Sequence, residues 1–409
     1  MNKLYLNNYK IQDRDEVIAM LQSAYGCLGF TCEDIGAYSN QIPQCQESIT
    51  TLAGYQPATN VKDESLIDLD IWQIKILTRV KAFRAVQKLY NFGKNSVIDK
   101  SALVYDSIGS MATSDDRVIA GYWLWPFQKY HNSVFYAHQT IVYALGGYGR
   151  YARMTSQQRG EFIYKTIQYQ VMYMYALSQF YKCFAKCLKG ESAIEKYWDK
   201  GVAYVVGSLE ETSAETMDGM LMFDLANKRC SQFGTCNEDG RAEILSEIMA
   251  AFDGGRDAAV AMNCENVRLS AARLAHVLMV PVLQSVLHYA IKIKNLDQQS
   301  GSKDLAEGEV YALSVLPLIA EYNWESQREI EVSMIMKDGK KPVERGPQAV
   351  ADAIGVVASK FGVTCSHIGA DAEELVDCCR SVSGGSSPSY SRLRLFIDMI
   401  LLCVVHNTL

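Results

Sequence analysis

Apolar side chains recur at intervals of three and four residues along most of this chain. Between residues 64 and 92 the repeating positions are Leu66, Leu69, Trp72, Ile76, Val80, Phe83, Val86 and Leu89. Residues at this spacing share one face of an α-helix. Further helices are expected over residues 13–27, 157–188, 193–210, 240–261, 265–293, 303–321 and 347–360. The pattern therefore predicts a mainly α-helical protein.

Local signals mark some helix ends and interruptions. Thr155-x-x-Gln158 and Ser192-x-x-Glu195 fit the capping box, in which side chains satisfy the first backbone N–H groups of a helix. Pro281 lies inside the expected helix 265–293 and is expected to kink it. Residues 100–155 are aromatic-rich and predicted to be irregular, forming either a packing layer or an aromatic-lined pocket.

One segment favours a strand. The sequence EIEVSMIM, within residues 325–346, alternates polar and apolar side chains and precedes the Asp-Gly pair of KDGKK. Alternation followed by Asp-Gly is typical of a β-hairpin. We therefore expect at most a small β-hairpin in this protein.

Two stretches, residues 192–211 and 301–321, predict an internal duplication. Superimposing Gly201 on Gly308 also superimposes Tyr204 on Tyr311. In the preceding helices, Gln170, Tyr175 and Ala176 match Gln284, Tyr289 and Ala290. The predicted parts are 1–63 (helix and first cysteine loop), 64–238 and 239–324 (two helical repeats), and 325–409 (hairpin-like segment, second cysteine loop and apolar terminal helix).

Composition fits this architecture and narrows the partners. The 409 residues are 49% hydrophobic and 21% charged, with only eight prolines, as in a globular helical protein. A net charge of −6 argues against nucleic acid or an anionic membrane as the main partner. Leu393–Val405 is the nearest approach to a membrane span, but it is short and charged. We expect a buried terminal helix there, and no membrane span. The first residues do not resemble a signal peptide, so a secreted form would be mature or trimmed.

Twelve cysteines indicate disulfides. Cys32 and Cys45 are 13 residues apart, as are Cys365 and Cys378, and both loops begin Thr-Cys-x-x-Ile-Gly-Ala. A third bond is predicted between Cys230 and Cys236. Zinc sites would need close pairs such as C-x2-C with further ligands. The pairing of the other six stays open, namely Cys27, Cys183, Cys187, Cys264, Cys379 and Cys403.

The sequence contains no recognisable catalytic motif. It has no G-x-S-x-G elbow, no phosphate-binding G-x-x-x-x-G-K-[ST] loop and no H-E-x-x-H. None of its six histidines follows a glutamate by three residues, as the di-iron bundles require. We therefore expect a protein that is not an enzyme.

Oxygen ligands for a hard cation are the remaining candidate chemistry. Glu195 and Asp199 share one helix face, with Tyr204 on the same helix; the second copy carries Glu307 and Glu309. Carboxylate and phenolate oxygens suit ferric iron. The acids of the two copies do not superimpose, so the alternative is a capping glutamate, solvated acids and core tyrosines. The repeated glycines are best explained by close helix packing.

Several motifs together resemble a known family. They are YWDKGVAYVVGSLE, FDLANKRCSQFGTC, FRAVQKLYNFGKNS, TCEDIGA and AEGEVYALSVLPLI. They are similar to the algal iron-assimilating periplasmic proteins, also described as high-CO2-inducible, and to the related domain of the diatom iron-starvation-induced proteins. The resemblance spans residues from about 20 to 380. It implies a secreted, periplasmic or cell-surface protein with disulfides and a link to iron acquisition.

Three functions follow for testing. The first is an extracellular iron-assimilation protein that binds or presents iron, its metal partner, without catalysis. The second is a structural or assembly scaffold of the algal cell surface, with cell-surface or self-assembly partners. The third, a metal-dependent oxidase, would need acids and histidines clustered in one cavity.

Overall fold

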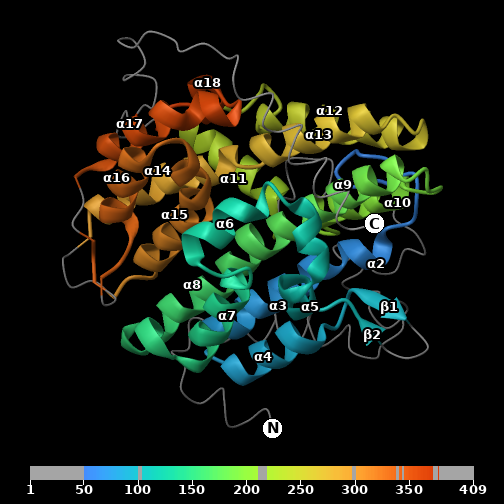
Figure 1. Cartoon of the computed structure of the whole chain (residues 1–409). Coiled ribbons are helices and arrows are strands. Elements are labelled where there is room, and N and C mark those ends of the chain that lie inside the picture. Colours follow the sequence, from blue (N-terminus) through green and yellow to red (C-terminus); the bar gives the residue numbers. More distant parts are fainter. Residues whose placement is uncertain are drawn as a thin grey trace.

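The protein is mainly helical in a computed structural model that describes residues 50–99, 104–210, 219–296, 301–337, 340–342, 345–371 and 376. The elements are labelled in Figure 1, where η marks 3-10 turns and, for η5, a π turn. In chain order they are α2 (Lys62–Ser65), α3 (Ile67–Arg79), α4 (Phe83–Phe92), β1 (Val97–Asp99), β2 (Val104–Tyr105), α5 (Ile108–Thr113), η3 (Asp115–Ala120), α6 (Leu124–His131), α7 (Tyr136–Gly146), η4 (Gly149–Arg153), α8 (Ser156–Thr166), η5 (Ile167–Val171), α9 (Met172–Leu188), α10 (Glu195–Val206), α11 (Met222–Phe233), α12 (Ile244–Val260), α13 (Cys264–Val277), α14 (Val280–Lys294), α15 (Lys303–Tyr322), α16 (Trp324–Met334), α17 (Pro347–Ala358), η6 (Ser359–Phe361) and α18 (Cys365–Ile368).

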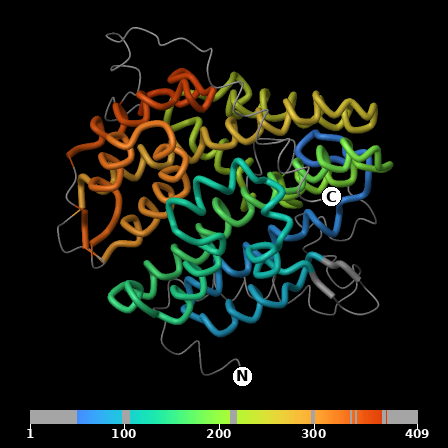
Figure 2. Tube along the Cα trace, viewed as in Figure 1, coloured from blue at the N-terminus to red at the C-terminus, as the bar shows by residue number. Residues whose placement is uncertain are grey.

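A long helix made of α8, η5 and α9 runs through the protein and packs against helices on several sides. Its first part packs against α3, α7 and α15, and its second part against α10 and α13. Figures 1 and 2 show α12 and α13 running side by side along one edge, and α14 to α17 gathered on the other side. The long helix therefore contacts both groups, through α13 on one side and α15 on the other.

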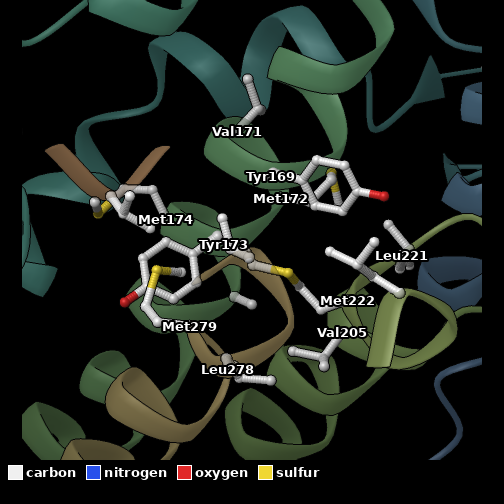
Figure 3. Packing of buried hydrophobic residues seen from close by; sticks show 14 of the residues in the cluster. Tyr169, Val171, Met172, Tyr173, Met174, Val205, Leu221, Met222, Leu278 and Met279 are labelled. Atoms are coloured by element: carbon white, nitrogen blue, oxygen red, sulfur yellow. The ribbon is translucent and has the colours of Figure 1, made fainter. Parts of the chain in front are cut away.

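Side chains stabilise both the start of the long helix and the π turn within it. The predicted capping box is confirmed, because Gln158 N donates to Thr155 Oγ1 (3.2 Å) and Thr155 N to Gln158 Oε1 (2.9 Å). The π turn Ile167–Val171 lies entirely in the core. Figure 3 shows Met172 and Met174 in one buried cluster with Met222 of α11 and Met279 of the turn between α13 and α14. Flexible thioethers fill irregular core gaps such as those around a π turn.

Most of the helices expected from periodicity are present. Residues 64–92 form α2, α3 and α4, which ends before Gly93 with its φ of 64°. The predicted helices 157–188, 193–210, 240–261, 303–321 and 347–360 correspond to α8 to α9, α10, α12, α15 and α17, with ends shifted by a few residues. The range 13–27 lies outside the described residues.

The predicted strand is wrong. Most of EIEVSMIM belongs to helix α16, which Asn323 caps by accepting a hydrogen bond from Ser326 N (2.7 Å). Ile330 and Met334 are buried one helical turn apart. The buried positions therefore follow the period of a helix and not the two-residue alternation of a strand. The Asp-Gly turn itself lies outside the described residues, although Lys337 and Lys340 form an isolated bridge. The small antiparallel hairpin is instead β1–β2.

Three other local predictions are corrected. Residues 100–155 are largely helical where described, in α5, α6 and α7. Ser192 does not cap α10, since Ile194 precedes the helix and no side chain caps it. Pro281 does not kink one helix. It lies in the first turn of α14, where no N–H is needed, and α13 ends at Val277.

Two disulfides lie within the described residues. Cys230 and Cys236 are bonded as predicted, with their Cα atoms 4.8 Å apart. Cys187 at the end of α9 is bonded to Cys264 at the start of α13. The predicted pair Cys32–Cys45 lies outside the described residues, as does Cys378, the predicted partner of Cys365.

The two helix pairs that suggested a duplication pack in similar ways. The rings of Tyr175 and Tyr204 lie 5.1 Å apart between α9 and α10, and those of Tyr289 and Tyr311 lie 5.4 Å apart between α14 and α15. These tyrosines are the positions matched in the sequence. The duplication and the domain boundaries themselves stay predictions.

Gly201 allows the close approach of α10 to α9. A Cβ atom at Gly201 would lie 2.4 Å from the ring of Phe180, which is itself fully buried. At Gly308 the nearest atom would be 2.8 Å away, on Ile293. The packing purpose predicted for both glycines is therefore confirmed.

Gly201→Ala should lower the free energy of unfolding by about 1–3 kcal/mol, because the added methyl group overpacks the helix contact. Gly254→Ala on α12 is the matched control. The nearest atom there, Ser270 Oγ, would be 3.8 Å away, so the better helix propensity of alanine should add up to about 1 kcal/mol of stability. Urea denaturation of both variants measures the difference. Equal effects would contradict the packing argument.

Within the described residues, the stretch Cys264–Lys294 is long enough for a membrane span and contains an 18-residue window with a mean hydropathy of 1.6. That window is 83% buried inside the protein, and the stretch consists of two helices, α13 and α14. Core helices commonly have such a composition. Leu393–Val405, the segment discussed from the sequence, lies outside the described residues.

Candidate functional site

The five predicted metal ligands do not meet at one place. Asp199 is fully buried in α10 and accepts hydrogen bonds from Tyr55 Oη (2.5 Å) and from Thr59 N and Oγ1 (2.8 Å each). Its partners lie about 140 residues earlier in the chain. Asp199 therefore ties α10 to residues 55–59, and three donors already occupy its oxygens.

The other two predicted ligands of α10 have separate surroundings. The buried Tyr204 donates its hydroxyl hydrogen to Asp106 Oδ2 at 3.1 Å. Burial, followed by the charge of Asp106, raises the pKa of Tyr204 well above its usual value. Glu195 is half-buried at the first position of α10, where its negative charge interacts favourably with the positive end of the helix dipole.

Glu309 is held in an ion pair with Arg150, in which the acid is buried and the arginine side chain is 38% exposed. The Glu309 side chain is completely buried and lies 2.6 Å from Arg150 Nη1, while Met336 N donates to Oε2 at 2.8 Å. Arg150 also donates to the carbonyl oxygen of Met336. Glu309 therefore fixes the chain that follows α16 against α15.

Glu307 lies in a different group, the acid–tyrosine cluster, which the four elements α8, η5, α14 and α15 form in the core. Its members are Glu161, Tyr164, Lys165, Tyr169, Tyr289, Lys303, Glu307 and Tyr311. In α8 the spacing of 161, 164 and 165 places three polar side chains on the face that packs against α15. The cluster thus combines two carboxylates, two ammonium groups and four phenols.

Two lysines and a tyrosine surround the carboxylate of Glu307. Lys303 donates to Oε1 at 2.8 Å, Tyr289 donates its hydroxyl hydrogen to Oε2, and Lys165 Nζ lies 3.7 Å from Oε2. Burial opposes ionisation of Glu307, but the charges of Lys165 and Lys303 outweigh it and lower the pKa to about 2. Glu307 is therefore an anion at any physiological pH.

Glu161 is the unsatisfied member of the cluster. Only 8% of the residue is exposed, and among the described residues its Oε2 atom has no hydrogen-bond partner. Burial and the neighbouring charge of Glu307 raise the pKa of Glu161 to about 7. A buried oxygen without a partner is costly, and strongly shifted acids in such a setting are candidates for function.

Tyrosine rings of the cluster lie around Lys165. The ring centroids of Tyr169 and Tyr311 are 5.0 Å apart, and Lys165 donates to the hydroxyl of Tyr311 at 3.1 Å. Burial raises the pKa of Tyr164 and Tyr169 well above the usual value. These phenols therefore stay protonated unless a strong cation replaces their protons.

This donor set fits a hard cation only if phenolates take part. Within the described ranges, no three His, Cys, Asp or Glu side chains come together as a metal site would require. Glu161 and Glu307 supply two carboxylates, and Tyr164 and Tyr289 are their hydrogen-bonded phenols. Carboxylate and phenolate oxygens are the ligands that ferric iron favours. Lys165 Nζ lies 3.7 Å from Glu307 Oε2, so its charge partly balances that of the two carboxylates.

Sequence reasoning identified Glu307 but not Glu161, Tyr164, Lys165 or Tyr289 as its neighbours. A signal was present in GEFIYK, where Glu161 and Lys165 interrupt the apolar face of a core helix. Its meaning depended on knowing that α8 packs against α15.

Comparison of the chain with protein-family models, with curated proteins and with solved structures gives no match.

Proposed function

We propose that this chain is an extracellular or cell-surface iron-assimilation protein that binds ferric iron without catalysis, and that the acid–tyrosine cluster holds the metal. The observation that carries the proposal is the buried oxygen of Glu161, which has no partner in the described structure and lies beside a second carboxylate and two phenols. Cations stabilise such an arrangement directly.

Ligand type supports ferric iron in particular. Glu161 and Glu307 would contribute carboxylate oxygens, and Tyr164 and Tyr289 phenolate oxygens once deprotonated, while Lys165 and Lys303 balance part of this negative charge. Phenolate oxygen is a ligand that ferric iron favours. Lys303, whose side chain is 54% exposed, connects Glu307 with the protein surface. We infer that iron exchanges with solvent beside this lysine.

The disulfides support the extracellular part of the proposal. Cys187–Cys264 and Cys230–Cys236 are bonds of the kind that form and persist in oxidising compartments. The motif resemblance to algal iron-assimilating proteins favours the same location. Secretion, periplasmic location and cell-surface attachment are all consistent with it.

Titration with ferric citrate tests the proposal. Wild-type protein should develop the visible charge-transfer absorption of a phenolate bound to iron, and Tyr289→Phe should weaken or remove it. Glu161→Gln should reduce the affinity for ferric iron by more than about tenfold, since a neutral amide of the same shape replaces an anionic carboxylate ligand. Elemental analysis of the natively purified protein provides an independent readout.

Glu195→Gln is the matched control, because Glu195 was a predicted ligand and lies outside the cluster. It should leave both the absorption and the affinity unchanged. Loss of binding in Glu195→Gln, with binding retained in Glu161→Gln, would place the metal at the start of α10 instead. A folded wild-type protein that binds no iron would overturn the proposal.

The scaffold alternative has its own supporting observation. Tyr122, Trp125 and Trp324 are 52%, 52% and 63% exposed. Lys129 on α6 pairs with Glu321 at the end of α15, which holds the regions of Trp125 and Trp324 together. Exposed aromatic side chains in one region are typical of interaction surfaces. Defined oligomers that form without bound metal would favour this function.

A further inference from the structure

A second group of buried oxygens lies where the chain returns to the core after α10. Asp68 on α3 accepts hydrogen bonds from Ser208 Oγ (2.8 Å) and from the backbone N–H groups of Ser208 (2.5 Å) and Leu209 (2.7 Å). This anchoring fixes the position of the next residue, Glu210, whose side chain is buried with only 8% of the residue exposed.

Glu210 and Asp224 lie side by side. The point that a Cβ atom of Gly219 would occupy is 1.7 Å from Glu210 Oε1 and 2.7 Å from Asp224 Cβ. A side chain at position 219 would displace both acids, so glycine leaves the space that they fill. Asp224 is 2% exposed. Two carboxyl groups are therefore confined together in the core.

Three oxygens of this region have no hydrogen-bond partner among the described residues. They are Glu210 Oε1, Asp224 Oδ1 and Gln168 Oε1. The amide of Gln168 is held in place because its Nε2 donates to the carbonyl oxygen of Met220 at 2.6 Å. Its free oxygen thus belongs to the surroundings of Gly219 and Met220. Native proteins rarely leave several neighbouring acceptors unsatisfied.

We propose that Glu210, Asp224 and Gln168 form a binding site for a hard divalent cation such as Ca²⁺, separate from the acid–tyrosine cluster. All three supply oxygen, and carboxylate together with amide oxygen is the ligand set that Ca²⁺ prefers. Lys228 binds only Oδ2 of Asp224, at 2.5 Å, which leaves Oδ1 for the cation. Lys75 Nζ is 4.0 Å from Met220 Sδ, and its charge, like that of Lys228, opposes the rise that burial causes in the pKa of Asp224.

The closeness of the two acids also affects the pKa of Glu210. Burial and then the charge of Asp224 raise it to about 8, and Asp68 acts in the same direction. Lys228 and Arg241 oppose the shift.

Calorimetric titration of Ca²⁺ tests the site. Wild-type protein should bind one Ca²⁺ here and gain thermal stability as calcium is added. Glu210→Gln and Asp224→Asn should each reduce the calcium affinity by more than about tenfold.

Folding of the variants is a separate readout. Glutamine resembles protonated glutamic acid, the form that Glu210 adopts near neutral pH, so Glu210→Gln should fold without calcium as well as the wild type does. Glu161→Gln should lose iron binding and keep calcium binding, which separates this proposal from the iron proposal. Folded wild-type protein that binds no Ca²⁺, or unchanged calcium affinity in Glu210→Gln, would overturn the proposal.

Discussion

Arg150→Met is expected to lower the free energy of unfolding by about 2–3 kcal/mol, because it leaves the carboxylate of Glu309 buried without its counter-charge. The loss should be smaller than for a fully buried pair, since the side chain of Arg150 is 38% exposed and solvent screens part of its charge. The side chain of Glu309 is not exposed at all, and Arg150 contacts both of its oxygens, at 2.6 and 2.9 Å. After the substitution only Met336 N would still donate to this carboxylate. Urea denaturation at neutral pH measures the loss.

A double variant separates two contributions: the lost attraction between Arg150 and Glu309, and the cost of burying the carboxylate of Glu309 without a partner. Arg150→Met combined with Glu309→Leu should recover most of the lost stability, since a buried ion pair can often be replaced by apolar side chains at little net cost. Lys129→Met is the control for an exposed pair: Lys129 is 59% exposed beside Glu321, and its loss should cost below about 1 kcal/mol. An equally small effect for Arg150→Met would mean that Glu309 is solvated or protonated in the folded protein.

Replacing both Cys187 and Cys264 by serine is expected to cost about 4 kcal/mol of stability, by the loop-entropy relation for the 77 residues that separate them. The bond joins the end of α9 to the start of α13, and these helices also contact each other through Tyr173 Oη, which donates to the carbonyl oxygen of Ala275 at 2.8 Å. The folded state should therefore keep its geometry, while the unfolded chain gains freedom.

The short disulfide provides the comparison. Cys230 and Cys236 are six residues apart, so their double serine variant should lose only about 2 kcal/mol by the same relation. Chemical denaturation of both variants under non-reducing conditions measures the ratio. Cys183 should not interfere, because its thiol is buried and burial raises its pKa to about 12. A larger loss from the short bond would contradict the entropic argument.

Local pattern was sufficient for much of the fold. The capping box at Thr155 and the periodicity of the core helices depend on residues three or four positions apart, and these predictions are confirmed. The prediction of a strand over EIEVSMIM failed because alternation over eight residues fits a strand as well as a half-buried helix. The cap at Asn323, which lies outside that window, decides between them.

The candidate sites depend on contacts that no local pattern contains. Asp199 has the right spacing from Glu195 for a shared helix face, but its partner Tyr55 is 144 residues away in sequence. The same holds for Glu161 and Glu307, which come together only because α8 packs on α15. Likewise the bond between Cys187 and Cys264 has no signature in spacing. Sequence reasoning could nominate residue types, whereas tertiary packing selects their neighbours.

The π turn at Ile167–Val171 has a consequence for how this protein can change over evolution. One extra residue in a helix advances the angular phase of everything after it by about 100°. The turn therefore sets the angle between the face of α8 that meets α15 and the face of α9 that meets α10. A one-residue deletion here would rotate the two faces out of phase, so insertions and deletions should be excluded from this segment far more strictly than substitutions.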